Sequence, residues 1–310
     1  MPAPVDLVYV LGSGSQWNNN ELRISLRSVE RNLKNFGKIF VVGEDPGFLS
    51  SNVIYIYYPD EISTRNADGN MARKIIRACA DPRLSDNFLF MNDDFIINKE
   101  IDAAEIPWMH KGDMKDRPPK FWKSQFYRYR LRRTFDVLSE RNLPTLQYDY
   151  HAPMLMNKKK FPQVMAKFDY AADIGYTFRS LYGNSLKLKA EPLVDQKITM
   201  YESYTLAQIK ARVALPVFVG YNDLGLNNSF KYWMVTTFHE QSRFEKNNYF
   251  NDRISDIAQW QLNGMDYHTG VAIFLRYHKA KNVSRILADN RTIALETKLK
   301  FKLTQYLLNL

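Results

Sequence analysis

The sequence predicts an α/β fold: a Rossmann-type mixed sheet flanked by helices, with a smaller helical portion at the C-terminus. Two observations lead to this fold class. Apolar, β-branched runs of strand length alternate with amphipathic helical patterns over residues 6–91, which is typical of parallel sheets with crossover helices. From about residue 252 onward the pattern becomes mainly helical and basic. We therefore expect a core domain over residues 1–250 and a basic helical portion over 251–310 packed on it.

The first strand is expected at 6–11, an apolar run that ends at a Gly-Ser-Gly-Ser turn. A helix follows, for which Asn20 is the expected N-cap and Gly37 the expected stop. Further strands are expected at 38–43, 53–58 and 87–91, and a helix at 70–80. In the second half of the chain we expect a loop at 111–120 followed by a helix, a helix at 202–213 and a strand within 215–225.

Composition describes an ordinary globular protein, with 45% hydrophobic and 25% charged residues among 310. No apolar run approaches the roughly 18 residues of a membrane span, and the N-terminus lacks the features of a signal peptide. We expect a cytoplasmic protein without integral membrane association (host cytoplasm if a phage encodes it), or a mature form whose signal has been removed. Cys79 is the only cysteine, which excludes an internal disulfide and a cysteine-based zinc site.

The net charge of +10 favours association with polyanions or anionic substrates. This charge is uneven, because nine Lys or Arg face only two acids between Lys111 and Arg133. We interpret the basic, aromatic stretch in this region as the acceptor-binding segment, since cations neutralise phosphates and aromatic rings stack on bases. The alternative is an amphipathic helix with an aromatic core face and a solvated cationic face. The candidate residues are Lys120, Trp122, Lys123, Tyr127, Arg128, Arg130, Arg132 and Arg133.

An acidic turn follows the predicted strand at 87–91. Asn92, Asp93 and Asp94 would stand at a strand end, where hard oxygen ligands suit Mg²⁺ or Mn²⁺ and a bound cation would bridge substrate phosphates. The simpler interpretation is a pair of acids that cap a turn or pair with an arginine. Asp93 and Asp94 are the predicted metal ligands, and Asn92 is a predicted donor-binding residue.

The glycine turn after the first strand is the second candidate segment. Backbone N–H groups of Gly12, Ser13 and Gly14 could form an anion-binding nest, although a plain turn would give the same letters. Arg73 and Lys74, on the next helix, could reach a pyrophosphate or could be solvated. Because both turns follow strands of a parallel sheet, they are expected to face one cleft.

Three residues are candidates for acid–base work. Asp149 and His151 stand two residues apart, so the acid could orient the histidine or act as a base itself. Asp223 is a third candidate at a strand end, although Asn-Asp-x-Gly is also ordinary turn chemistry. The alternative for His151 is a histidine packed in a loop.

Ordered sequence blocks resemble the Stealth sugar-phosphate transferases. "ELRISLRSVERN" (21–32), the strand at 38–49 and "FLFMNDD" (88–94) look like that family's E-L-R-x-S-L-R-S helix, strand and L-N-D-D turn. "HAPMLMNKKKF" (151–161) is similar to its H-x-P segment, and "FHEQSRFE" (238–245) to its closing P-x-x-S-x-[FY]-E segment. His239 and Glu245 are thus weak site candidates. The S-x-x-E spacing of Ser242 and Glu245 also fits a helix capping box.

The resemblance implies a GT-A-like core in which D-x-D-type acids bind a metal and the donor diphosphate. Asp93 and Asp94 would then be metal and donor ligands, and His151 an active-site residue. The chain departs from the family after its first strand, where "VLGSGSQW" replaces the usual V-[DN]-G-[ST]-D. Transfer of the sugar alone is therefore an equal alternative to transfer of a sugar phosphate.

The predicted function is metal-dependent transfer of a sugar from a nucleotide-sugar, a UDP-sugar by preference, to a hydroxyl on a polyanionic acceptor. Hydroxylated bases of phage-type modified DNA are the leading acceptor hypothesis, because flipped bases suit stacking residues and cations. One alternative is Stealth-type hexose-1-phosphate transfer to a capsule or cell-surface glycan. Another is a non-catalytic nucleic-acid-binding protein on a transferase fold.

Overall fold

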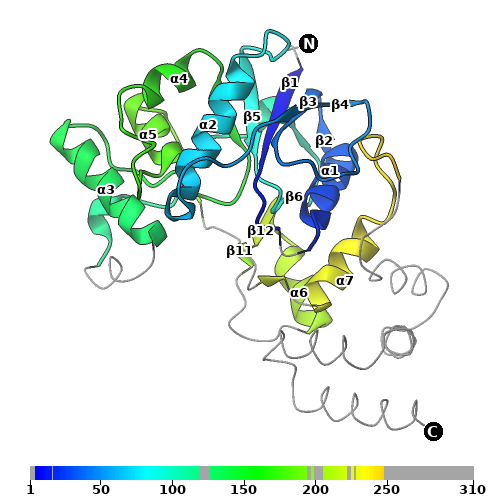
Figure 1. The fold of residues 1–310 in the computed structure, drawn as a ribbon. Coiled ribbons are helices and arrows are strands. Elements are labelled where there is room, and N and C mark those ends of the chain that lie inside the picture. The colour runs from blue at the N-terminus through cyan, green and yellow to red at the C-terminus, as the bar shows by residue number, and fades with distance from the viewer. Residues whose placement is uncertain are drawn as a thin grey trace, which may run out of the picture.

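A mixed α/β fold with a mainly parallel central sheet flanked by helices confirms the predicted class (Figure 1). The computed structural model describes residues 4–15, 17–118, 126–193, 197–198, 205–221, 225–226 and 228–247. The predicted basic helical portion at 251–310 lies outside this range, so the domain division stays a prediction. Within the described residues, no helix is both long enough and apolar enough to cross a membrane.

The central sheet has five strands in the order β4-β3-β1-β5-β9. The first four are parallel, and β9 runs antiparallel to β5 at one edge. Six of the seven residues of β1 are buried, because helices cover both faces of the sheet. The strands are β1 Val5–Leu11, β3 Phe36–Gly43, β4 Val53–Tyr57, β5 Asn87–Met91 and β9 Met154–Asn157.

The strand order reverses beside β1. From β1 the chain passes through α1 (Asn20–Asn32) to β3 on one side, and it later passes from β4 through α2 (Ala67–Cys79) to β5 on the other. Right-handed crossovers in opposite directions place these two helices on opposite faces of the sheet. Such a reversal opens a crevice at the carboxyl ends of the two strands concerned, here β1 and β5.

Helix α1 differs from its prediction at both ends. Its N-cap is Asn19, in a left-handed conformation with φ 59°, and not Asn20. The helix ends at Asn32, short of Gly37, because Leu33 turns extended and pairs with Ile101. The short strands that form this pair are β2 Leu33–Lys34 and β7 Ile101–Asp102.

A second, smaller layer lies beyond the carboxyl edge of the central sheet. Its three-stranded sheet has the order β11-β12-β6, and Phe95 pairs antiparallel with Gly220. Two helices cover this sheet (Figure 1), and their apolar residues form a second core cluster with Ile24 of α1. The elements are β6 Phe95–Ile97, β11 Lys197–Ile198, β12 Phe218–Tyr221, α6 Leu206–Val213 and α7 Asn228–Thr237.

The remaining helices are α3 Phe126–Glu140, α4 Lys160–Met165 and α5 Phe178–Ser185. They lie at the β9 edge of the sheet, where α4 packs on β9, α5 on α4 and α3 on α5. They form one group beyond α2 in Figure 1. Short elements complete the described chain: β8 Met109–His110 paired with β10 Glu191–Pro192, and 3-10 helices η1 Thr64–Asn66, η2 Ala103–Glu105 and η3 Met114–Asp116.

Candidate functional site

A cavity of about 240 Å³ opens at the carboxyl ends of β1 and β5, where the strand order reverses. Both turns singled out in the sequence contribute to it. Gly12 and Gly14 enter from the loop after β1, and Asn92, Asp93 and Asp94 from the turn after β5. The full lining is Gly12, Gly14, Ser15, Glu21, Asn92, Asp93, Asp94 and Tyr221. Ser13 is exposed on the same glycine turn.

The acidic turn is fixed by hydrogen bonds on its far side. The Phe95 N–H donates to the Asn92 carbonyl over 3.2 Å, which closes the turn. The Ser25 hydroxyl of α1 donates to the Phe95 carbonyl over 2.5 Å and lies 2.9 Å from the Tyr9 hydroxyl of β1. The turn is thus held against both a central strand and a buried helix.

The cavity concentrates negative charge. Burial raises the pKa of Asp93 well above its usual value, and the neighbouring carboxylates of Asp94 and Glu21 raise it further. Burial also raises the pKa of Glu21, while the Lys231 ammonium of α7 opposes that shift. The Asn92 Oδ1 atom is buried without a hydrogen-bond partner among the described residues. A cation at the turn would satisfy this oxygen and offset the crowded carboxylates.

Glu21 lines the cavity and is a functional candidate that the sequence analysis did not identify. Its Oε2 accepts a 2.8 Å hydrogen bond from the Ser15 hydroxyl. The same hydroxyl accepts from the backbone N–H groups of Trp17 and Asn19 over 3.2 and 2.7 Å. Glu21 therefore fixes the glycine turn at the start of α1 as well as lining the cavity. Only its position six residues after Ser15 could have hinted at this contact.

A fully protein-built metal cage is not present in the described part of the chain, where no group of three or more His, Cys, Asp or Glu could hold a metal ion. Two carboxylates and an amide oxygen are nevertheless enough for a cation that takes its other ligands from substrate phosphates and water, as Mg²⁺ commonly does. The donor set at residues 92–94 fits such an ion.

The two predicted phosphate-binding cations, Lys74 and Arg73, have protein partners. The Lys74 ammonium is buried, donates to the Leu11 carbonyl over 2.8 Å and forms an ion pair with Asp60. It secures the end of β1, one residue before the glycine turn, and does not line the cavity. Arg73 pairs with Glu61 and donates to the Tyr58 hydroxyl over 2.9 Å.

The antiparallel pairing of β9 with β5 brings His151 to the same edge of the sheet. Its ring meets the Phe95 ring edge-on, with centroids 6.2 Å apart. His151 thus lies against the residue that closes the acidic turn, although it is not among the residues that line the cavity.

Asp149 is buried beside a different set of partners. Its Oδ2 accepts a 2.6 Å hydrogen bond from the Ser180 hydroxyl, and its Oδ1 lies 4.0 Å from Arg179 Nε. It does not line the cavity. Asp223, the third acid–base candidate, lies outside the described residues.

The predicted acceptor segment is divided between buried and exposed positions of α3. Arg130 is buried, donates to Asp68 Oδ2 over 2.8 Å and also binds the Arg65 carbonyl. The Tyr127 hydroxyl accepts a 2.9 Å hydrogen bond from Gln147. Both side chains are engaged within the fold, and the buried position of Arg130 differs from the solvated cationic face that the amphipathic-helix alternative expects.

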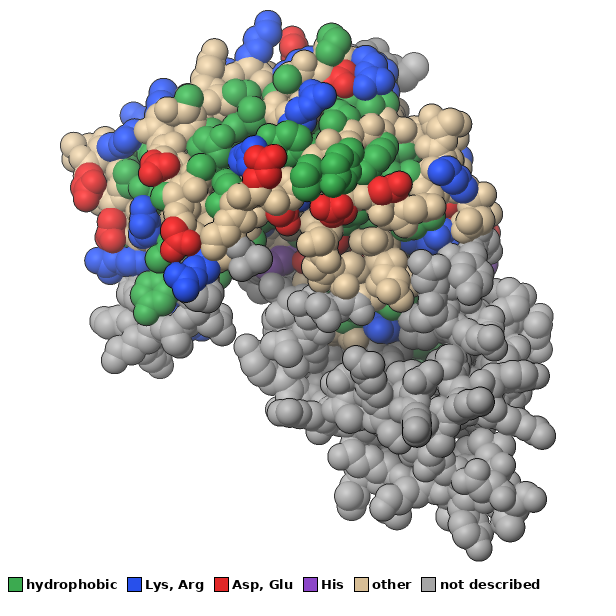
Figure 2. Space-filling view, in the orientation of Figure 1, with side chains coloured by type: hydrophobic (Ala, Val, Ile, Leu, Met, Phe, Trp, Pro, Cys, Tyr) green, Lys and Arg blue, Asp and Glu red, His purple; other side chains and the backbone are tan. Residues whose placement is uncertain are grey.

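Exposed Arg132 pairs with Asp136 in the next helical turn, whereas exposed Arg133 lies 5.1 Å above the Tyr176 ring. Arg128 is partly buried, and Lys120, Trp122 and Lys123 lie outside the described residues. On the face shown in Figure 2, acidic side chains are interspersed among the basic ones. The described part of this face therefore does not present a field of one sign.

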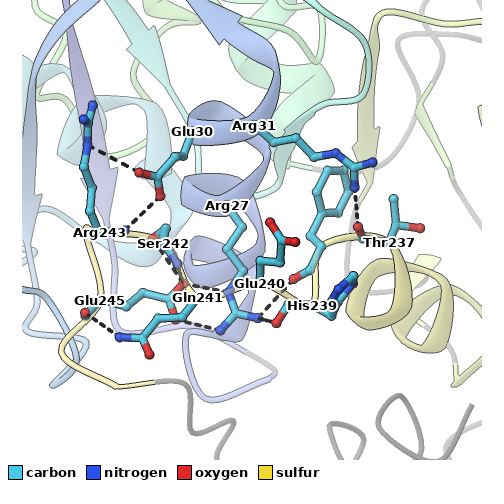
Figure 3. Close-up of a pocket in the computed structure, with 11 residues that line it drawn as sticks. Arg27, Glu30, Arg31, Thr237, His239, Glu240, Gln241, Ser242, Arg243 and Glu245 are labelled. Carbon is cyan, nitrogen blue, oxygen red and sulfur yellow. Dashed lines mark hydrogen bonds and ion pairs between the residues drawn. The ribbon is translucent and has the colours of Figure 1, made fainter. Parts of the chain in front are cut away.

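A second cavity, of about 770 Å³, lies between α1 and the segment that follows α7 (Figure 3). At its wall Glu245 forms buried ion pairs with both Arg23 and Arg27, and Arg243 pairs with Glu30 at the rim. His239 also lines this cavity, away from the acidic turn.

The capping-box interpretation of Ser242 and Glu245 is wrong in one respect. The Ser242 hydroxyl does bond Glu245 Oε1 over 3.2 Å, but Glu245 pairs as an isolated β-bridge with Leu49 and does not stand in a helix. Its carboxylate instead neutralises two arginines of the E-L-R-x-S-L-R-S helix. The first and last blocks of the family resemblance therefore meet in one buried ion cluster.

Comparisons with known proteins add a distant structural likeness only. No protein-family model matches the chain, and no curated protein matches it. Among solved structures, the apo form of mouse xyloside xylosyltransferase 1 is similar over 72% of this chain and 99% of that one, with 11% sequence identity and a TM-score of 0.36. Because a likeness of that size does not carry a functional assignment, we argue function from the site itself.

Proposed function

We propose that the chain is a glycosyltransferase that uses a nucleotide-sugar donor and a divalent cation, Mn²⁺ or Mg²⁺. The observation that supports this most is the position of the cavity. It lies at the reversal of strand order, the place where open α/β sheets bind their ligands, and it joins a glycine turn to a crowded acidic turn. A diphosphate is the ligand whose chemistry needs both features.

Each side of the cavity has a role in this proposal. Asp93, Asp94 and Asn92 would hold the cation, which neutralises charge that develops on the departing diphosphate. The backbone of Gly12–Ser15 would donate N–H groups to the phosphates. Glu21 keeps that turn in place through Ser15, and Lys231 supplies a positive charge near Glu21.

His151 would position or deprotonate the acceptor hydroxyl. Its contact with Phe95 places it beside the turn that carries the cation ligands. Asp149 is the weaker choice, because Ser180 and Arg179 engage its two oxygens. Asp223 is proposed as a further candidate for the same role.

For the acceptor we propose a polyanion, and hydroxymethylated DNA is the first substrate to test. Exposed Arg132 and Arg133 support it, although Arg130 and Tyr127 are occupied within the fold. Stealth-type transfer of a sugar phosphate to a glycan is the second candidate. The observation behind this candidate is that the first and last resembling blocks meet at Glu245.

The test is turnover of a panel of nucleotide-sugars with Mn²⁺, followed by the mass of the product. A sugar increment on DNA supports the first acceptor, and a sugar-phosphate increment on a glycan supports the second. Asp94→Asn should abolish turnover, whereas Asp86→Asn, at the amino end of the same strand, should preserve it. Salt-sensitive DNA binding without any metal-dependent nucleotide binding would instead identify a non-catalytic binding protein.

A further inference from the structure

Arg179, on α5, is a buried cation that lies beside the acidic turn and beside the backbone next to His151. Its Nη1 donates to the carbonyl of Tyr150, the residue before His151. Its guanidinium carbon lies 5.6 Å from the centroid of the Phe90 ring and 5.7 Å from that of the Phe95 ring. These two phenylalanines stand on either side of the acidic turn in the sequence. One side chain therefore touches the flanks of the turn and the backbone beside His151.

Arg179 is connected to His151 by two routes. The first is the Tyr150 carbonyl, which fixes the backbone immediately before the histidine. The second is the Phe95 ring, which lies against both the guanidinium and the imidazole and is inclined at 78° to the imidazole plane. Displacing the guanidinium would therefore move the histidine relative to the turn.

Burial of this charge is costly and only partly compensated. Removing a cation from water is unfavourable, and Asp149 Oδ1 lies no closer than 4.0 Å to Arg179 Nε. An apolar side chain could fill the same space without that cost. Unlike an apolar side chain, a guanidinium is planar and has donors in fixed directions. It can therefore hold the Tyr150 carbonyl and the Phe90 and Phe95 rings in place at the same time.

We propose that Arg179 is a positioning residue that sets His151 against the Asn92–Asp94 turn. The significance of this role for catalysis rests on the proposed function. The geometric role does not, because it concerns only the placement of His151.

Arg130 provides a matched control for Arg179. It is also buried and also lies near Asp68, and it donates to Asp68 over 2.8 Å and to the Arg65 carbonyl. Replacing either arginine with lysine keeps the charge and loses the planar fork. A purely structural contribution predicts similar effects from the two substitutions.

The experiment compares Arg179→Lys with Arg130→Lys by NMR of ¹⁵N-labelled histidine side chains, with the His151 signals assigned from His151→Gln. We expect Arg179→Lys to shift the His151 ring signals and Arg130→Lys to leave them in place. In the transferase assay, kcat should fall at least about tenfold in Arg179→Lys, with the donor KM within about twofold. His151 signals that coincide with those of the wild type in Arg179→Lys would overturn the proposal.

A second variant covers the case in which Arg179→Lys does not fold. Phe95→Leu removes the ring that contacts both Arg179 and His151 while leaving the buried charges in place, and it should also shift the His151 signals. Unchanged signals there would refute the second route. If the wild type neither binds nor turns over any nucleotide-sugar, the proposed function fails, while the NMR comparison still decides the positioning role.

Discussion

Replacing Glu245 with Gln should destabilise the protein strongly. The Glu245 carboxylate is completely buried and forms ion pairs with two buried arginines, Arg23 and Arg27. Its Oε1 also accepts a hydrogen bond from the Ser242 hydroxyl. The glutamine keeps the shape of the side chain but removes the negative charge, so that two buried guanidinium groups lose this counter-ion.

The expected loss in unfolding free energy is about 3–5 kcal/mol, the usual effect of removing one partner from a buried ion pair. This is a large part of the roughly 5–15 kcal/mol that stabilises a typical domain. At about 2–4 °C per kcal/mol for a chain of comparable size, the melting temperature should fall by at least about 6 °C. The upper part of the range applies here because one carboxylate serves two arginines.

Urea denaturation followed by near-UV circular dichroism measures this loss. Glu240→Gln is the matched control, because Glu240 lies on the same segment and is exposed. The control should stay within about 0.5 kcal/mol of the wild type. A Glu245→Gln protein that loses less than about 1 kcal/mol would refute the reasoning, because it would mean that the two arginines are not buried against this carboxylate.

Two further predictions concern the core. Gly43→Ala should destabilise the protein by more than about 1 kcal/mol in urea, because Gly43 has φ 141° and an added Cβ would lie 1.8 Å from the Leu11 carbonyl oxygen; an unchanged midpoint would contradict this. Burial raises the pKa of Asp68 from 3.8 to about 6, with Arg130 opposing, so the folded state holds this proton more tightly than the unfolded chain does. The stability that this proton adds is fully present below pH 3.8 and is lost as the pH rises through about 6. The free energy of unfolding should fall over that range by on the order of 3 kcal/mol. Urea titrations between pH 4 and 7 should show this fall in the wild type and not in Asp68→Asn, and equal pH slopes in the two proteins would count against it.

Strands and turns with strong local signals could be predicted from the sequence. The apolar runs that became β1, β3, β4 and β5 are continuous and end at turn residues, so that neither their type nor their order along the chain depended on distant contacts. For the same reason the sequence alone places the two turns that line the cavity at the ends of strands.

Features that depend on distant contacts could not be predicted. The end of α1 is set by the pairing of Leu33 with Ile101, which no local pattern encodes. Arg130 looked like a surface cation within a basic run, yet its partner, Asp68, lies 62 residues away. The Arg27–Glu245 ion pair spans 218 residues, so the S-x-x-E spacing at Ser242 suggested a local cap instead.

The central claim, a cation-dependent diphosphate site at the acidic turn, is tested most directly by calorimetric titration of UDP with and without Mn²⁺. We expect the wild type and Asp86→Asn to bind UDP with Mn²⁺ and to lose that binding when the metal is removed. Asp94→Asn should bind the Mn²⁺–UDP pair at least about tenfold more weakly, a difference of about 1.4 kcal/mol. Equal Mn²⁺–UDP affinity in Asp94→Asn and the wild type would contradict the account.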